Sequence, residues 1–189
     1  MVCNWQLDFK TALLDNISKA GLSRLCYLWG VMQIREMDLA ELDQVIGLYL
    51  DGLKREMIFL ESIFPGKQVS AKGVGELTKI LLNMFKTNEG KIFVAIEGAN
   101  CVGYCLVTKK FYPAEIPQMC GCINGVFVTQ AFRKQGLGRK LYEASVNWLK
   151  QEGINYIELY HALNDDEAKG FWNTLGFKAV QVTCAKWIR

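Results

Sequence analysis

Hydrophobic residues recur at helical spacing in two segments of the first half of the chain. The first segment follows Asp38, which suits a helix N-cap, and consists of Leu39, Leu42, Ile46, Tyr49 and Leu53. The second consists of Leu77, Ile80, Leu81, Met84 and Phe85, and Asn88-Glu89-Gly90 ends it. Pro65-Gly66 separates the two segments, so residues 61–72 are predicted to form a loop. The pattern predicts two helices before residue 90.

After residue 90 the pattern changes to short runs that are typical of strands. Strands are predicted at Ile92–Glu97 and Cys101–Lys109, joined as a hairpin by Gly98-Ala99-Asn100. A loop with two prolines over 111–119 leads to a strand at 121–128. Helices over about 138–152 and 166–175 then alternate with strands over 154–160 and 177–188, and Met32-Gln33-Ile34-Arg35 fits a first strand. This order predicts a mixed α/β fold, a partly parallel central sheet with helices on both faces.

Residues 1–31 stand apart from this alternation. Four apolar residues there, Leu14, Ile17, Leu25 and Leu28, are compatible with one side of a helix, although Gly21 interrupts it. We therefore expect an N-terminal extension over 1–31 and a single domain over 32–189. An additional N-terminal helix is also compatible with a homodimer.

Composition indicates an ordinary folded domain, because 51% of the residues are hydrophobic and 22% are charged. No apolar run approaches the roughly 20 residues that span a bilayer, and a net charge of +3 is too small to indicate nucleic acid, so neither is expected as a partner. Seven cysteines without disulfide-framework spacing suggest reduced thiols and a cytoplasmic location. Cys101, Cys105, Cys120 and Cys122 fall on predicted strands rather than in the tight turns of zinc ligands, so no metal is expected.

The stretch from Val126 to Arg139 carries the clearest chemical signal. A hydrophobic strand leads into a loop that contains Gly136, Gly138 and several cations, and this loop then opens a helix. Glycines let the backbone approach a ligand closely, and the free N–H groups at a helix start favour a phosphate. The spacing does not match a nucleotide P-loop, and it lacks the third glycine of a dinucleotide fingerprint. The loop therefore indicates a different phosphate-bearing ligand.

Two motifs together resemble the GNAT superfamily of N-acetyltransferases. Arg133-x-x-Gly136-x-Gly138 after a hydrophobic strand is similar to the acyl-CoA loop of that superfamily. The later stretch Asn164-Asp165-Asp166-Glu167-Ala168-Lys169-Gly170-Phe171-Trp172-Asn173-Thr174-Leu175-Gly176-Phe177 looks like its asparagine-containing turn, helix and closing Gly-Phe. The resemblance covers residues 33–189 and implies an acyl-CoA N-acyltransferase fold.

The resemblance also implies where acetyl-CoA, the expected cosubstrate, would bind. Its pantetheine arm would lie between two splayed strands, against backbone groups of Val126, Phe127 and Val128, with the Val128 amide as oxyanion donor. The pyrophosphate would be held by the backbone of the loop, namely Arg133, Lys134, Gln135, Gly136, Leu137 and Gly138, together with Arg139. Asn164 would touch the pantetheine, with Asp165 competing for that role, and Trp172 would border the same site.

The expected reaction is transfer of an acetyl group to a primary amine of a small molecule or a peptide. The usual general acid of the superfamily is a tyrosine, and the matching position here is Trp172, whose indole N–H is a very poor acid. Tyr160 is therefore a candidate proton donor, and His161 and Glu115 are candidate bases. The alternatives are a catalytically degenerate acyl-CoA-binding sensor or partner module, transfer of a longer acyl group, and transfer to an alcohol.

Overall fold

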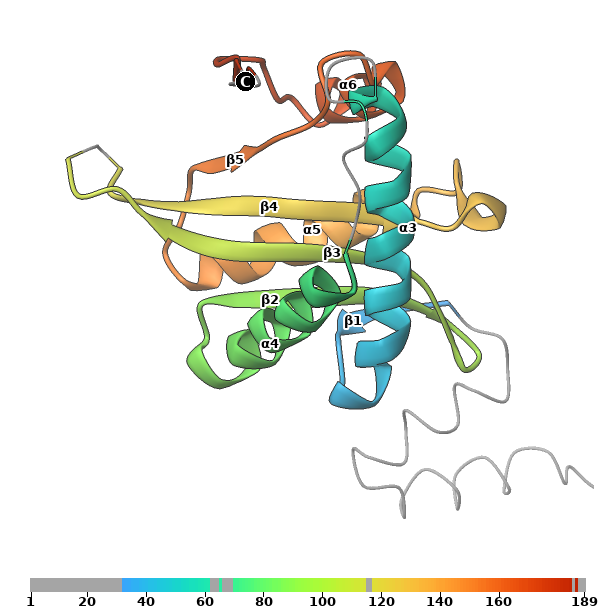
Figure 1. The fold of residues 1–189 in the computed structure, drawn as a ribbon. Helices are drawn as coiled ribbons and strands as arrows, with labels where there is room; N and C mark the ends of the chain where they lie inside the picture. The colour runs from blue at the N-terminus through green and yellow to red at the C-terminus, as the bar shows by residue number, and fades with distance from the viewer. Residues whose placement is uncertain (1–31, 62–64, 66–69, 115–116, 185, 187–189) are drawn as a thin grey trace, which may run out of the picture.

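The computed structural model of the chain describes residues 32–61, 65, 70–114, 117–184 and 186, so the predicted N-terminal extension over 1–31 lies outside the described residues. Within them, five strands form one sheet in chain order: β1 (Gln33–Glu36), β2 (Gly90–Glu97), β3 (Asn100–Phe111), β4 (Met119–Val128) and β5 (Ile157–Leu159). Neighbouring strands from β1 to β4 are antiparallel, and β5 is parallel to β4 (Figure 1).

Helices cover both faces of this sheet. Helices α3 (Leu42–Leu60) and α4 (Ala71–Thr87) pack on one face, and α5 (Leu137–Gln151) packs on the other (Figure 1). The short helix α6 (Asp166–Thr174) lies beyond β5, near the C-terminal end of α3. The predicted mixed, partly parallel α/β fold is confirmed.

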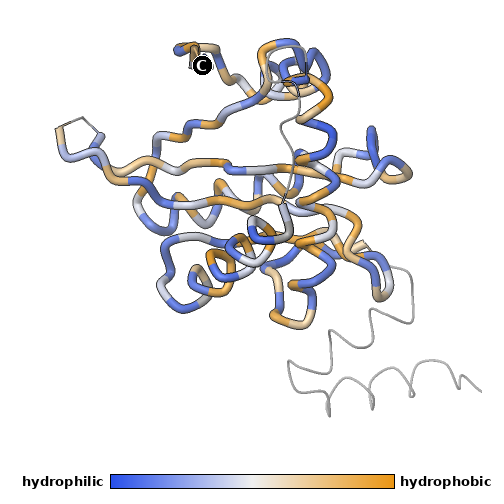
Figure 2. The backbone as a smooth tube through the Cα atoms, in the orientation of Figure 1, coloured by the Kyte–Doolittle hydropathy of each residue, from blue (hydrophilic) through white to orange (hydrophobic). Residues whose placement is uncertain are grey.

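Alternation along the strands builds a separate core on each face of the sheet. Val94 and Tyr104 pack toward α3 and α4, whereas their chain neighbours Ala95 and Cys105 pack toward α5. The central strands are consequently apolar over most of their length, while the helices mix apolar and polar residues (Figure 2). The helix α5 turns the predicted residues inward, Leu141, Ser145, Trp148 and Leu149, and all four are buried.

A capped 3-10 turn over Leu39–Glu41 leads directly into α3. Asp38 accepts a hydrogen bond from the Ala40 N–H at 3.2 Å, and Glu41 accepts one from the Asp38 N–H at 2.9 Å, which together form a capping box. Glu41 is only 5% exposed, and its carboxylate pairs with the guanidinium of Arg35 on β1. This pair ties the helix start to the edge of the sheet.

The predicted last strand over 177–188 is wrong for the described residues of that segment, which form no strand after Gly176. Val180 and Val182 have the alternation of a strand, but both are exposed and neither pairs with β5. A strand needs a ladder partner as well as the right residues, and the sequence pattern reports only the residues. For the same reason β5 is limited to three residues rather than the predicted 154–160.

None of the helices in the described part of the chain has the length and hydrophobicity that crossing a membrane requires.

Cys101, Cys105, Cys120 and Cys122 are buried free thiols on β3 and β4. The described residues also contain no cluster of three or more side chains of the types that hold a metal ion.

Candidate active site

An opening between β4 and β5 begins at a β-bulge. Along β3, the partners of Leu106 and Val107 on β4 are Gly125 and Ile123, so Asn124 is an extra residue on β4. Strand β5 pairs with β4 only over Gly121–Ile123. From Gly125 to Val128, therefore, β4 stays paired with β3 but has no pairing with β5. The two parallel strands diverge at the bulge.

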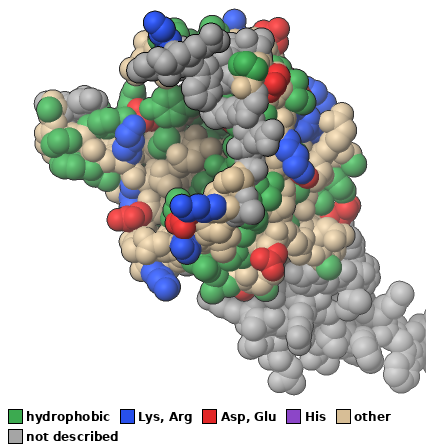
Figure 3. Space-filling model, in the orientation of Figure 1, with side chains coloured by type: hydrophobic (Ala, Val, Ile, Leu, Met, Phe, Trp, Pro, Cys, Tyr) green, Lys and Arg blue, Asp and Glu red, His purple; other side chains and the backbone are tan. Residues whose placement is uncertain are grey.

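A cavity of about 470 Å³ occupies this divergence. Its walls come from α3, the first half of β3, the second half of β4, the loop before α5 with the first turn of that helix, the segment just after β5 and α6. The face of the molecule that carries α3 is visibly hollowed beside this helix (Figure 3). The cavity is therefore where segments far apart in the sequence meet.

The backbone of β4 directs alternate residues into the opening. The Thr129 N–H donates to the Val102 carbonyl at 2.9 Å, which makes Val128 and Gly103 a non-hydrogen-bonded pair of the antiparallel ladder. The N–H and C=O groups of Val128, and by alternation those of Val126, consequently point away from β3. The backbone groups of Phe127 point toward β3 instead, so Phe127 offers the cavity its ring rather than the backbone groups predicted from the resemblance.

The loop before α5 presents backbone N–H groups at the other end of the cavity. Lys134 has φ +60° and Gly136 has φ +79°, and Gly136 is the N-cap of α5. Alternation of left-handed residues with ordinary ones turns successive N–H groups to one side of a loop. Gly138 lies close to Phe171 of α6, because a Cβ atom there would be 3.4 Å from the ring. The geometry suits an anion at the start of α5.

Cations of this loop lie against the same opening. The Arg133 Nε donates to the Val128 carbonyl at 2.8 Å, and its guanidinium lies 5.4 Å from the centre of the Phe127 ring. The Lys134 Nζ is 3.2 Å from a carboxylate oxygen of Glu167 on α6. These two side chains line the cavity, and Arg133 also fixes the end of β4.

Most predicted cofactor-binding residues therefore line one cavity, with two exceptions. Gln135 does not line it, and its amide donates to the Ala131 carbonyl at 3.1 Å. Asn164 does not line it either, and its amide donates to the Phe59 carbonyl at 3.3 Å. Asp165 does line the cavity, and it also caps α6 by accepting from the Ala168 N–H at 3.0 Å. The predicted lining residues are Val126, Phe127, Val128, Arg133, Lys134, Gly136, Leu137, Gly138, Arg139 and Trp172.

Trp172 closes the α5 side of the cavity as a rigid aromatic wall. It is 8% exposed, and its ring makes edge contacts with Tyr142 and Phe177 at centroid distances of 6.1 and 5.4 Å. Burial raises the pKa of the Tyr142 phenol above its ordinary value. A phenol held in its protonated form thus lies behind the indole.

Two of the predicted catalytic residues lie at the end of β5, on the rim of the cavity. The His161 Nδ1 lies 2.8 Å from the Ala162 carbonyl. Because a carbonyl only accepts, this contact puts the proton on Nδ1 and leaves Nε2 as the basic nitrogen. Tyr160 is 65% exposed, and its hydroxyl lies 3.5 Å from a Glu158 carboxylate oxygen. Glu115 lies outside the described residues.

The α3 side of the cavity carries polar residues that the sequence motifs did not indicate. Tyr49 and Glu56 of α3 line it, together with Tyr104 of β3. Burial, reinforced by the charge of Glu56, raises the pKa of the Tyr49 phenol, and burial also raises that of Tyr104. The helical spacing of Tyr49 marked a buried helix face, but nothing in the sequence indicated that this face borders the opening at Asn124.

Comparison with known proteins decides the family. A family model described as the acetyltransferase (GNAT) family matches residues 57–177, which is more than half of the chain. The chain belongs to the GNAT acetyltransferase family. The match contains both predicted motifs, and the GNAT resemblance inferred from them is therefore confirmed. None of the curated proteins gives a significant match to the sequence.

Solved structures share the GNAT fold with this chain at low sequence identity. A transcriptional regulator from Bacillus halodurans is 24% identical with a TM-score of 0.66, and the alignment covers 84% of this chain and 100% of that one. The aminoglycoside N-acetyltransferase AAC(6')-Iy in complex with CoA is 16% identical with a TM-score of 0.64, over 84% and 95% of the two chains. A predicted acetyltransferase from Clostridium acetobutylicum, solved with acetyl-CoA, is 18% identical with a TM-score of 0.64, over the same shares.

Proposed function

We propose that the chain is an N-acetyltransferase that moves the acetyl group of acetyl-CoA to a primary amine by direct attack on the thioester. The observation that carries this proposal is the bulge at Asn124, because it opens β4 beside a loop of backbone N–H groups at the start of α5. An extended pantetheine with a phosphate at one end matches a strand edge that leads to an anion site. The solved complexes of related fold with CoA and acetyl-CoA agree with this assignment.

The β4 edge would hold the reacting end of the cosubstrate. The outward N–H of Val128 is the proposed oxyanion donor, since it would polarise the thioester carbonyl as the tetrahedral centre forms. The carbonyl of Val128 already accepts from Arg133, so the edge is held in place before any ligand arrives. The loop from Arg133 to Gly138, with Arg139, would bind the pyrophosphate.

The acceptor amine would approach from the α3 side, where Tyr49, Glu56 and Tyr104 line the cavity. An alkyl ammonium with a pKa near about 10.4 must lose a proton before it can attack. His161 Nε2 at the rim is the proposed base among the described candidates, because its Nδ1 proton is engaged by the Ala162 carbonyl. The carboxylate of Glu56 favours an acceptor that arrives as a cation.

After attack, a CoA thiolate leaves whose conjugate thiol has a solution pKa of about 8–9. Trp172 stands at the position where the superfamily has its tyrosine, and an indole cannot supply this proton. Tyr160 at the end of β5 is the proposed donor. We place the reaction in the cytoplasm, because the cysteine usage fits a reducing compartment.

The test follows free-thiol release from acetyl-CoA in the presence of polyamines, aminoglycosides, amino acids and peptides. The proposal predicts release that depends on one class of amine and a matching acetylated product. Saturable binding of acetyl-CoA without thiol release for any amine of the panel would instead support the second candidate, an acyl-CoA sensor or partner module. The presence of Trp172 where the superfamily has a tyrosine favours this candidate. Absence of acetyl-CoA binding would contradict both.

A further inference from the structure

An ion-pair cluster joins the acceptor-side helix α3 to the cofactor-side helix α6 across the cavity mouth. The Arg55 guanidinium of α3 lies 2.5 Å from a Glu167 carboxylate oxygen and 3.6 Å from one of Asp165. Lys134 approaches the same Glu167 carboxylate at 3.2 Å, and Arg133 approaches it at 3.8 Å. All five side chains line the cavity.

Glu167 is thus the anion on which the cations of the phosphate loop converge. Hydrogen bonds from Arg55 and then Lys134 are the largest causes that lower the pKa of Glu167, so it is a carboxylate at neutral pH. It is 40% exposed at its side chain, and it is therefore accessible to displacement by a ligand. A diphosphate carries a negative charge on each phosphate and offers more acceptor oxygens than one carboxylate.

We propose that Glu167 competes with the diphosphate of acyl-CoA for these cations, and that Arg55 is a cofactor-binding residue supplied by α3. This inference rests on the proposed function, since it names a further ligand of the same cosubstrate. A bidentate guanidinium is suited to phosphate oxygens as well as to a carboxylate. When the diphosphate binds, Arg55 exchanges Glu167 for phosphate oxygens.

The exchange of Glu167 for phosphate oxygens at Arg55 also affects the α3 side of the cavity, where the acceptor is proposed to bind. Arg55 directly precedes Glu56 on α3, and both residues line the cavity on the proposed acceptor side. With diphosphate bound, Arg55 therefore links α3 directly to the cofactor. Without it, Arg55 links α3 to the Glu167 carboxylate of α6. Cofactor binding and the position of the acceptor wall are coupled through one side chain.

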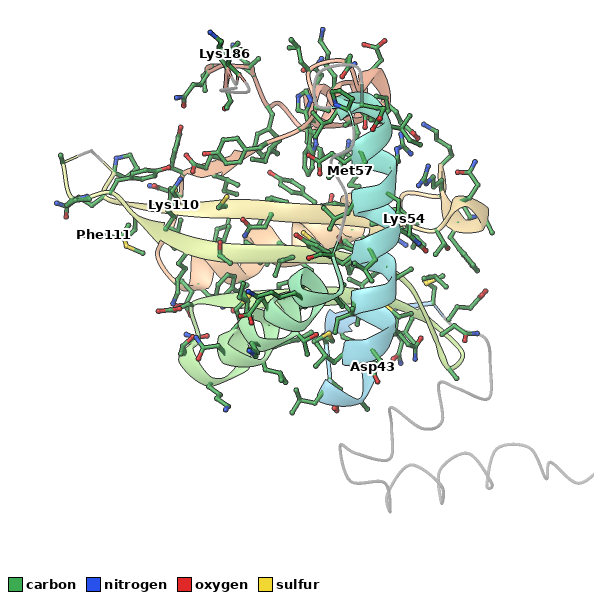
Figure 4. The ribbon with its side chains drawn as sticks, in the orientation of Figure 1. Asp43, Lys54, Met57, Lys110, Phe111 and Lys186 are labelled. Atoms are coloured by element: carbon green, nitrogen blue, oxygen red, sulfur yellow. The ribbon has the colours of Figure 1, made fainter. Side chains whose placement is uncertain are left out.

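Two variants and a control test the proposal, with CoA and pantetheine as probes in calorimetric titrations of the full chain. Glu167→Gln removes the competing charge and is expected to tighten CoA binding about threefold or more. Arg55→Gln in the Glu167→Gln background is expected to weaken it about tenfold or more, because a charge-assisted hydrogen bond to phosphate is lost. Lys54→Gln is the matched control. Lys54 is the neighbouring cation on α3 (Figure 4), it pairs with Asp51 at 2.9 Å, and it does not line the cavity.

Pantetheine lacks the diphosphate, so its affinity should stay the same in all variants, which also checks that each variant is folded. If Glu167→Gln leaves CoA affinity unchanged or weakens it, the competition is refuted. If Arg55→Gln has no effect once Glu167 is neutral, Arg55 acts only through Glu167 and its assignment as a ligand is refuted. If the wild-type chain binds neither CoA nor pantetheine, the proposed function itself fails.

Discussion

Replacement of Gly136 by valine is expected to weaken the proposed anion site while leaving the fold intact. Gly136 has φ +79° at the start of α5, and Gly153 has φ +75° just after its end. At neither position would a Cβ atom meet another atom within 4 Å. Valine therefore causes the same purely conformational penalty at both positions, about 1–2 kcal/mol for a left-handed residue with a side chain.

The two positions differ in how that penalty is relieved. Gly153 is followed by Ile154, which is 4% exposed and donates its N–H to the Leu149 carbonyl at 2.9 Å, so the backbone there is held by the core. Gly136 lies in an exposed loop that can relax to a negative φ. Relaxation turns the N–H groups away from a common point, and the penalty then appears in ligand affinity.

The assay is paired measurement of thermal stability and acetyl-CoA affinity. Gly153→Val should lower Tm by about 2–8 °C, as about 1–2 kcal/mol does in a domain of this size, with unchanged affinity. Gly136→Val should weaken acetyl-CoA binding by about 5–30-fold, with a smaller change in Tm. Unchanged acetyl-CoA affinity in Gly136→Val would refute the assignment of this loop to the phosphates.

Three further outcomes are expected. Glu41→Ala removes the buried partner of Arg35, whose own side chain is 29% exposed, together with one hydrogen bond of the capping box, and should cost about 1–3 kcal/mol in urea unfolding; a loss below about 0.5 kcal/mol would contradict a stabilising role of Glu41. Burial raises the pKa of the Cys105 thiol to about 12, so above pH 9 the unfolded state releases a proton that the folded state keeps. The free energy of unfolding should therefore fall between pH 9 and 12. Alkylation of the native protein should modify exposed Cys184 long before Cys105. Equal alkylation rates would count against that burial. Trp172→Tyr adds a phenol at the helix position where the superfamily has its tyrosine, as a second donor beside the proposed Tyr160, and should raise kcat for thiol release about tenfold or more; an unchanged kcat would mean that thiolate protonation does not limit turnover.

The sequence predicted those parts of the molecule that local patterns determine. Leu141 and Leu149 recur at helical spacing, and they are buried on α5 as predicted. The glycines of the loop were informative because a positive φ disfavours side chains, and this condition holds at Gly136, whereas Gly138 lies in van der Waals contact range of the Phe171 ring. Local conformation and one buried face are properties that a short stretch of sequence encodes.

Features that depend on distant partners were not predicted. No signal in Ile123-Asn124-Gly125 says which residue is extra, because the bulge is defined by the register against β3. The pair between Arg55 and Glu167 joins residues 112 positions apart. The sequence identified the loop that we propose as the phosphate site, but not the α3 side chains that face it.

The most direct test of the central claim is a calorimetric titration of acetyl-CoA into the wild-type chain, followed by displacement with CoA. We predict saturable one-to-one binding at a site that CoA shares and that Gly136→Val weakens while Gly153→Val does not. Absence of saturable binding, or binding that both variants affect equally, would contradict the assignment of the β4–β5 opening to acetyl-CoA.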